Sequence, residues 1–197
     1  MITAVAALTR LIEGNQRFVA GLRSLDTMLT HTKRAQLATK QEPFAIILGC
    51  SDSRVPAELV FDQGLGDLFV IRTAAQVLDK AVLGSLEFGV AELHIPVIVV
   101  LGHQHCGAVK AAIEILDCRG VAEADIEYLV KSLAPAVEQG KREGGDVWDR
   151  AVRAQIELLV AQLKRSPILA PAVEAGTLKI VGAWYSLETG LVEITVG

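Results

Sequence analysis

The chain has 197 residues, 51% of them hydrophobic and 21% charged, which favours a single soluble globular domain over residues 1–197. The net charge of −4 and the scattered lysines and arginines argue against nucleic acid as a partner. No apolar run reaches the roughly 18–20 residues that span a bilayer, so we expect no membrane association.

Residues 1–40 predict an N-terminal helical arm. Apolar residues recur at helical spacing between Thr3 and Gly21, and Thr3 suits the position that caps a first helical turn. This helix either covers its own domain or reaches a neighbouring subunit. A second, short helix is expected over residues 33–38.

Residues 41–120 predict strands that alternate with helices. Each expected strand is a short apolar run, and each expected helix carries apolar residues on one face. This order indicates parallel βαβ units. The expected strands are 44–49, 68–72 and 96–101, and the expected helices are 56–61, 77–93 and 106–116.

Residues 121–197 predict further helices followed by a pair of strands. The expected helices are 121–143, with a possible interruption at Pro135, then 146–165 and 166–175. Runs 177–185 and 190–196 read as strands joined by a hairpin. The fold class is therefore α/β: a parallel-rich central sheet flanked by helices, an N-terminal helical arm, and a C-terminal extension of helices and strands.

Metal-ligand side chains follow two of the predicted strands. Cys50 comes directly after Gly49, and His103 and Cys106 follow Gly102. Open α/β sheets place their ligand sites at the carboxyl ends of strands, and two thiolates with one imidazole are a common zinc set. We therefore predict one zinc site. Three cysteines, an odd number with two at metal-ligand spacing, fit a reducing compartment, so we expect a cytoplasmic protein.

Asp52 and Arg54 flank the predicted zinc site. The guanidinium of Arg54 can hold the Asp52 carboxylate with two hydrogen bonds and keep it ionised. An ionised aspartate beside zinc serves either as a fourth ligand or as the acceptor of a hydrogen bond from a zinc-bound hydroxide. The plainer alternative is a loop ion pair, which contributes little to stability.

The residues quoted above resemble a known family. Cys50-Ser-Asp52-Ser-Arg54 and Gly102-His103-x-x-Cys106-Gly107 are similar to the two signature motifs of β-class carbonic anhydrases. The resemblance is strong over residues 8–115 and looser beyond them. It implies a zinc enzyme that hydrates carbon dioxide reversibly to bicarbonate and a proton, by attack of zinc-bound hydroxide. It also implies a homodimer or homotetramer.

The resemblance assigns roles by position. Cys50, His103 and Cys106 would bind zinc, and Asp52 and Arg54 would form the catalytic dyad, with Asp52 a possible fourth ligand in a closed state. The substrate pocket would be formed by Gln41, often supplied by the partner subunit in the family, together with Phe69, Phe88 and Gly107.

The motifs leave other functions open. Carbonyl sulfide or carbon disulfide, linear relatives of carbon dioxide, would use the same pocket chemistry. A non-catalytic zinc or redox-responsive module would show a closed four-ligand site. A nucleotide-binding doubly wound domain is disfavoured, because the sequence has neither G-x-G-x-x-G nor G-x-x-x-x-G-K-[ST].

Overall fold

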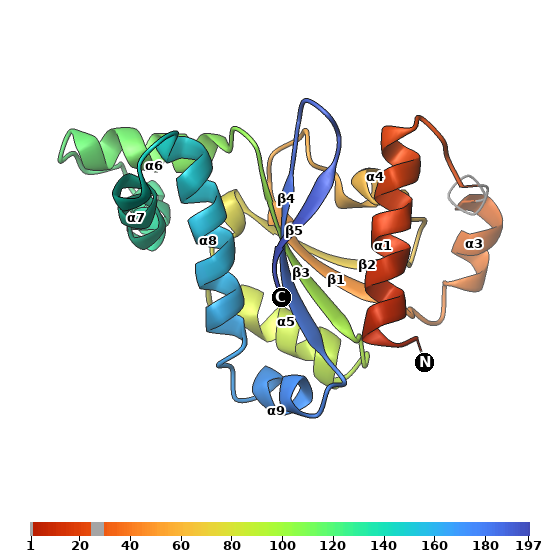
Figure 1. Ribbon diagram of the computed structural model, residues 1–197. Helices are drawn as coiled ribbons and strands as arrows, with labels where there is room; N and C mark the ends of the chain where they lie inside the picture. Colours follow the sequence, from red (N-terminus) through yellow and green to blue (C-terminus); the bar gives the residue numbers. More distant parts are fainter. Residues whose placement is uncertain (1, 25–29) are drawn as a thin grey trace.

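A five-stranded sheet crosses the centre of the molecule (Figure 1), in a computed structural model that describes residues 2–24 and 30–197. The strand order is β2-β1-β3-β4-β5. The first four strands run parallel and β5 pairs antiparallel with β4, which confirms the predicted α/β class and the hairpin. The strands are β1 (Ala45–Cys50), β2 (Leu68–Thr73), β3 (Val97–His103), β4 (Lys179–Tyr185) and β5 (Val192–Val196).

The two central strands, β1 and β3, are buried along their whole length. Burial on both faces explains why each is an unbroken apolar run instead of an alternating one. They pair in parallel, with Ile47 opposite Val99 and Gly49 opposite Leu101. This register brings the carboxyl ends of both strands to one edge of the sheet.

Over the described residues, each expected helix has an α-helix in the same order, and the short 3-10 helix η1 is additional. Two further differences concern α7. Residues 121–125 form no helix, because Ala124 has a positive φ of 48° that interrupts helical geometry. Conversely, Pro135 lies inside a continuous helix. The helices are α1 (Ala4–Val19), α3 (Thr30–Gln36), α4 (Ala57–Val60), the short 3-10 helix η1 (Ala74–Gln76), α5 (Lys80–Ala91), α6 (Gly107–Asp117), α7 (Ile126–Glu143), α8 (Val147–Leu163) and α9 (Leu169–Glu174).

Packing against α8 keeps α7 helical past Pro135. A Cβ added at Gly140 of α7 would lie 2.7 Å from the backbone nitrogen of Ala151, so the two helices approach closely there. A proline inside a helix removes one hydrogen bond, at a cost of about 3 kcal/mol. Burial of Leu133, Ala136 and Val137 on the same helix offsets that loss. None of the helices described has the length and apolar character needed to cross a membrane.

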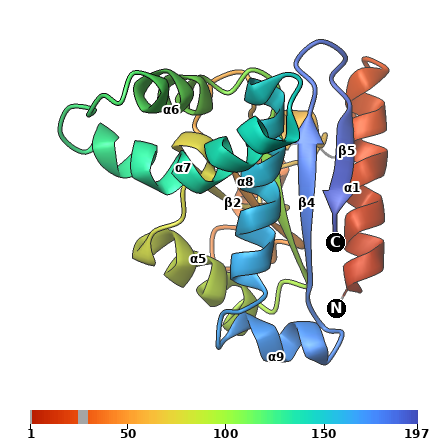
Figure 2. The same ribbon diagram turned by 60° about the vertical axis from the view of Figure 1, so that its left-hand side comes forward.

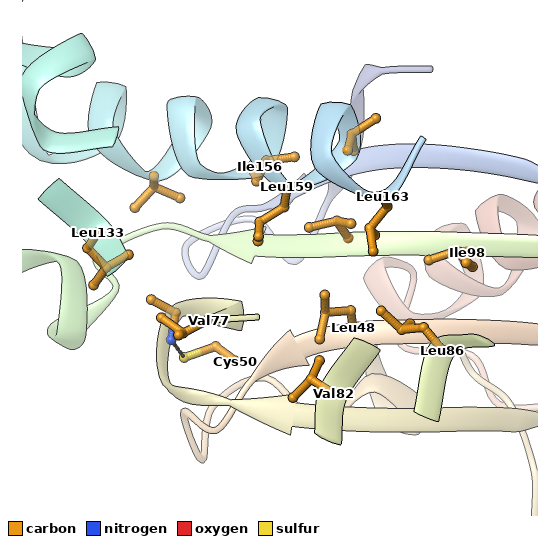
Figure 3. Close-up of a cluster of buried hydrophobic side chains, with 14 of the residues drawn as sticks. Leu48, Cys50, Val77, Val82, Leu86, Ile98, Leu133, Ile156, Leu159 and Leu163 are labelled. Atoms are coloured by element: carbon orange, nitrogen blue, oxygen red, sulfur yellow. Dashed lines mark hydrogen bonds between the residues drawn. The ribbon is translucent and has the colours of Figure 1, made fainter. Parts of the chain in front are cut away.

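Two hydrophobic cores lie on opposite faces of the sheet, with α8 on one side and α1 on the other (Figure 2). Because side chains alternate along a strand, Leu48 and Cys50 enter the core under α5 and α8, whereas Ile47 faces the core under α1. Figure 3 shows Cys50 at one end of the first core, with Leu48 and Leu86 further along it. Two candidate ligands, Cys50 and Cys106, thus belong to the packed interior.

Helix α1 covers its own sheet, one of the two arrangements that the sequence allowed. Its N-cap is Thr3, as predicted, and the Thr3 hydroxyl accepts a hydrogen bond from the Ala6 backbone at 3.2 Å. The buried Asn15 side chain donates to the carbonyl oxygens of Val60 and Gly190 and accepts from the Val192 backbone nitrogen. These bonds join the start of the chain to the β4–β5 hairpin.

Candidate metal centre

Three metal-ligand side chains meet where β1 and β3 end. The sulfur atoms of Cys50 and Cys106 and a ring nitrogen of His103 all lie within 4.8 Å of one another. Cys50 and His103 are the last residues of their strands, and Cys106 precedes α6. All three are buried, His103 completely. The parallel register therefore brings together the three ligands predicted from sequence.

The donor set fits a tetrahedral zinc ion. With Zn–S bonds of about 2.3 Å, two thiolates at the tetrahedral angle lie about 3.8 Å apart. The Cys50 and Cys106 sulfurs are 3.9 Å apart. His103 Nδ1 lies 2.9 Å from the carbonyl oxygen of Gln104, which assigns the ring proton to Nδ1. His103 Nε2 is buried and has no hydrogen-bond partner among the described residues, as suits a metal-binding lone pair.

The pKa values of the two thiols are shifted in opposite directions. A hydrogen bond from Cys106 lowers the pKa of Cys50 to about 4, against the opposing effect of burial. Backbone hydrogen bonds from Asp52 and Ala75 lower it further. The pKa of Cys106 is raised, because it donates to the Cys50 sulfur and is itself buried. The pair therefore holds a thiolate at neutral pH, a soft anionic donor of the kind that binds zinc.

Asp52 and Arg54 form the bidentate pair that the sequence predicted. Arg54 Nε donates to Asp52 Oδ1 at 2.9 Å and Arg54 Nη2 to Oδ2 at 2.7 Å, and the Arg54 backbone nitrogen adds a third bond to Oδ1. These hydrogen bonds lower the pKa of Asp52 to about 2. Its Oδ2 lies 3.9 Å from His103 Nε2. An ionised carboxylate, turned toward Arg54, therefore borders the metal cluster.

Several supporting contacts carry no obvious sequence signal. Arg72, near the end of β2, donates to the carbonyl oxygens of Cys50 at 2.8 Å and Asp52 at 2.6 Å. The Trp148 indole of α8 donates to the Cys106 carbonyl at 2.8 Å. Both side chains bind backbone oxygens, which every residue has, so residue identity at the acceptor gives no clue. The one available sequence signal was Arg72 itself, a charged residue near the end of an otherwise apolar strand.

Backbone strain concentrates around the cluster. Ala75, Gln76 and His105 all have positive φ, of 49°, 56° and 54°. A non-glycine residue in this region costs energy and persists only where its surroundings hold it. Here the Ala75 backbone nitrogen reaches the Cys50 sulfur at 3.3 Å, the dashed bond in Figure 3, and the Gln76 side chain donates to the Leu101 carbonyl at 2.8 Å. The strain is thus coupled to the geometry of the ligands.

The predicted pocket residues do not all lie beside the metal cluster. Gly107 begins α6 next to Cys106, and a Cβ added there would meet no atom within 4 Å. Phe69 and Phe88 have ring centroids 6.4 Å apart, but Phe69 pairs with Ile46, four positions before Cys50. Gln41 precedes β1 and lines a hollow at the opposite edge of the sheet. A single chain therefore does not bring Gln41 to its own metal cluster.

Comparison with known proteins gives consistent matches. The family model described as carbonic anhydrase matches residues 45–192. The chain is 46% identical over 191 residues to a carbonic anhydrase of Mycolicibacterium smegmatis, covering 96% of this chain and 92% of that protein. The solved β-carbonic anhydrase CcaA superimposes with a TM-score of 0.75 at 26% identity, covering 96% of this chain and 99% of that one. A structure described among two tetrameric β-carbonic anhydrases of Sordaria macrospora gives 0.74 at 23% identity, covering 83% and 89%.

Proposed function

The chain belongs to the β-class carbonic anhydrase family, and from that premise we propose that Cys50, His103 and Cys106 bind its zinc ion while Asp52 and Arg54 form its catalytic dyad. The chain is a carbonic anhydrase, catalysing the reversible conversion of carbon dioxide and water to bicarbonate and a proton. The observation that carries the assignment of the residues is the buried Cys50–His103–Cys106 cluster with an ionised Asp52 beside it.

In this mechanism each protein group has a defined task. Zinc, when bound, lowers the pKa of a coordinated water and so supplies hydroxide near neutral pH. Asp52 accepts a hydrogen bond from the attacking oxygen and directs a lone pair at the carbon of the substrate. Arg54 keeps Asp52 ionised and holds both of its carboxylate oxygens, which fixes the direction in which Asp52 accepts that bond. Because carbon dioxide is apolar, the reaction needs no further charged side chain in contact with the substrate.

We further propose that the chain works as a homodimer or homotetramer in the cytoplasm. Gln41, exposed at the far edge of the sheet, would serve the site of a neighbouring copy, with Phe69 and Phe88 lining the pocket for carbon dioxide and Gly107 contributing a backbone N–H. Two unoxidised thiols as ligands support a reducing compartment.

Stopped-flow hydration of carbon dioxide at pH 7 and pH 8.5, with zinc measured on the same samples, tests the residue roles. We expect about one zinc per chain in the wild type. Asp52→Ala keeps zinc but loses at least about 10²-fold in turnover, because the attacking oxygen is no longer oriented. Cys106→Ala loses the zinc itself.

The control is Asp117→Ala, which removes an exposed aspartate paired with Lys141 on the protein surface. It should leave zinc content and turnover unchanged. Near-wild-type turnover in Asp52→Ala would refute the dyad, and retention of a full zinc equivalent by Cys106→Ala would refute the ligand set.

A further inference from the structure

Gln104 follows the proposed zinc ligand His103 and makes hydrogen bonds through its backbone N–H, its backbone carbonyl and its side-chain Oε1. Its backbone nitrogen donates to the carbonyl oxygen of Tyr185 at 2.8 Å, and its own carbonyl faces His103 Nδ1 at 2.9 Å. Its side-chain Oε1 accepts from the backbone nitrogens of Leu187 at 3.1 Å and Glu188 at 3.4 Å. Every one of these partners except His103 belongs to the end of β4 or the turn that follows it.

That turn is itself held in place. The backbone nitrogen of Gly190 donates to the Ser186 carbonyl at 2.9 Å, which closes the tip of the β4–β5 hairpin. From the other side, Asn15 of α1 donates to the Gly190 carbonyl at 2.8 Å and accepts from the Val192 nitrogen at 2.8 Å. Asn15 is only 3% exposed, so water competes little for these bonds. The hairpin is therefore a fixed support for Gln104.

We propose that Gln104 is a positioning residue, which holds the His103 imidazole in place by anchoring the ligand peptide to the β4–β5 hairpin. The inference rests on the proposed binding of zinc by His103. A carbonyl that accepts from Nδ1–H fixes both the tautomer and the ring plane of a histidine ligand. The direction of the Gln104 carbonyl depends on its peptide, and the side-chain and backbone bonds to the hairpin prevent that peptide from rotating.

The neighbouring strain explains why an anchor is needed. His105, the next residue, has a strained φ of 54°. Its ring lies 5.0 Å from that of Trp148 and its carbonyl accepts from Arg54 Nη2 at 3.3 Å, so these contacts hold His105 from the side away from the hairpin. Cys106 is held separately, by the Trp148 indole. Without the Gln104 side chain, Gln104 would keep only its backbone bond to Tyr185 as a link to the hairpin. A less firmly fixed Gln104 peptide would weaken the binding of zinc by His103.

Two substitutions of nearly equal length separate the acceptor from the bulk of the side chain. Gln104→Met removes Oε1, whereas Gln104→Glu keeps an oxygen that accepts from the two backbone nitrogens. The measurement is the rate of zinc release from the intact protein to a colorimetric chelator in excess. We expect Gln104→Met to release zinc about 10-fold faster than the wild type, the lower end of the effect for such supporting residues. Gln104→Glu should release it at close to the wild-type rate.

Ser166→Ala is the matched control. The Ser166 hydroxyl also accepts from two backbone nitrogens, those of Ile168 and Leu169, but it lies near α9, at the end of β4 opposite the hairpin (Figure 1). It should lower the thermal midpoint without changing the rate of zinc release. This separates a general loss of stability from a loosened ligand.

The outcomes distinguish failure of the proposed function from failure of the positioning role. If the wild type binds no zinc, the proposed function itself fails. If the wild type holds zinc and Gln104→Met releases it at the same rate, the positioning role is wrong. Equal acceleration by Ser166→Ala would reduce the effect to stability, and failure of Gln104→Glu to restore slow release would exclude the acceptor as its cause.

Discussion

Asp62 is a carboxylate whose side chain has no exposed surface. Arg17 Nε donates to it at 2.6 Å and the Ser24 backbone nitrogen at 3.1 Å, and Arg23 lies 3.6 Å away. Burial raises the pKa of Asp62, but the hydrogen bonds from Arg17 and Ser24 and the two positive charges outweigh it, so the pKa is lowered. The charged form is thus preferred in the folded protein.

This preference predicts a stability that depends on pH. A lowered folded pKa contributes stability above the unfolded value, about 3.9 for aspartate, and the contribution is lost as pH falls through the folded value. Asp62→Asn should therefore cost about 2 kcal/mol at pH 7, the range for hydrogen bonds to charged groups, and progressively less toward pH 3. Urea unfolding of both proteins across this range measures the difference.

Glu13→Gln provides the control, because Glu13 is an exposed carboxylate on α1, the helix that carries Arg17. Its difference from the wild type should stay small at every pH. A gap between wild type and Asp62→Asn that stays constant from pH 7 to pH 3 would contradict the ionised, paired state of Asp62.

At the scale of single residues, the sequence predicted the cluster of candidate ligands but not what holds it. The meeting of Cys50, His103 and Cys106 was predictable because parallel strands end side by side. Trp148 and Gln104 were not, because each acts across more than 40 residues of chain on a backbone oxygen or nitrogen. Such contacts are specified by the fold as a whole, and no local pattern marks them.

At the scale of elements, the approach of α1 to the loop after α4 depends on a residue without a side chain. A Cβ added at Gly14 would lie 1.8 Å from the carbonyl oxygen of Phe61 and 2.8 Å from Gln63 Nε2. Backbone atoms cannot yield as a flexible side chain does, so α1 would have to move away from the sheet. That movement would also pull Asn15, the next residue, from its three partners.

Gly14→Ala should therefore destabilise the protein by about 3 kcal/mol, the upper range for overpacking. At about 2–4 °C per kcal/mol for a chain of this size, the thermal midpoint should fall by roughly 6–12 °C. Gly84→Ala is the comparison, since a Cβ in the middle of α5 would meet nothing within 4 Å. That variant should gain about 0.5–1 kcal/mol in helix propensity. Similar melting of the two variants would disprove the close approach.

The elements were predictable where local pattern and tertiary packing agree. Apolar runs gave the buried strands β1 and β3 to within two residues at either end. The interruption that the sequence allowed at Pro135 does not occur, because the contacts of α7 with α8 outweigh a local preference. Whether α1 covers its own domain or reaches a neighbouring subunit was left open, although an asparagine, Asn15, lies on its apolar face. A buried polar residue there indicated a specific partner, without saying which.

At the scale of the whole molecule, the position of Gln41 distinguishes an enzyme whose site is shared between two chains from one whose site lies within a single chain. If Gln41 serves a neighbouring copy, two inactive variants can restore each other. Gln41→Ala leaves the metal cluster intact, and Cys106→Ala leaves Gln41 intact. A hybrid dimer would then hold one complete site, made of the cluster from one chain and Gln41 from the other.

Subunit exchange between these variants should restore activity that neither has alone. In a random equal mixture, half of the dimers are hybrids with one complete site each, which gives about a quarter of wild-type activity. Stopped-flow hydration of carbon dioxide measures it, and sedimentation checks that mixed and unmixed samples have the same oligomeric state. A mixture no more active than the average of its parts would place Gln41 outside the site of a neighbour.

The hairpin contact also sets an order of events during synthesis. Gln104 and its partner Leu187 are 83 residues apart in the chain. At about 5–20 residues per second, a ribosome needs roughly 4–17 s to make that stretch. For nearly all of this interval the three residues of the candidate cluster have been translated, while the hairpin that supports His103 does not yet exist. The growing chain thus carries both cluster cysteines before their surroundings are complete, and the candidate metal site takes its final geometry late in maturation.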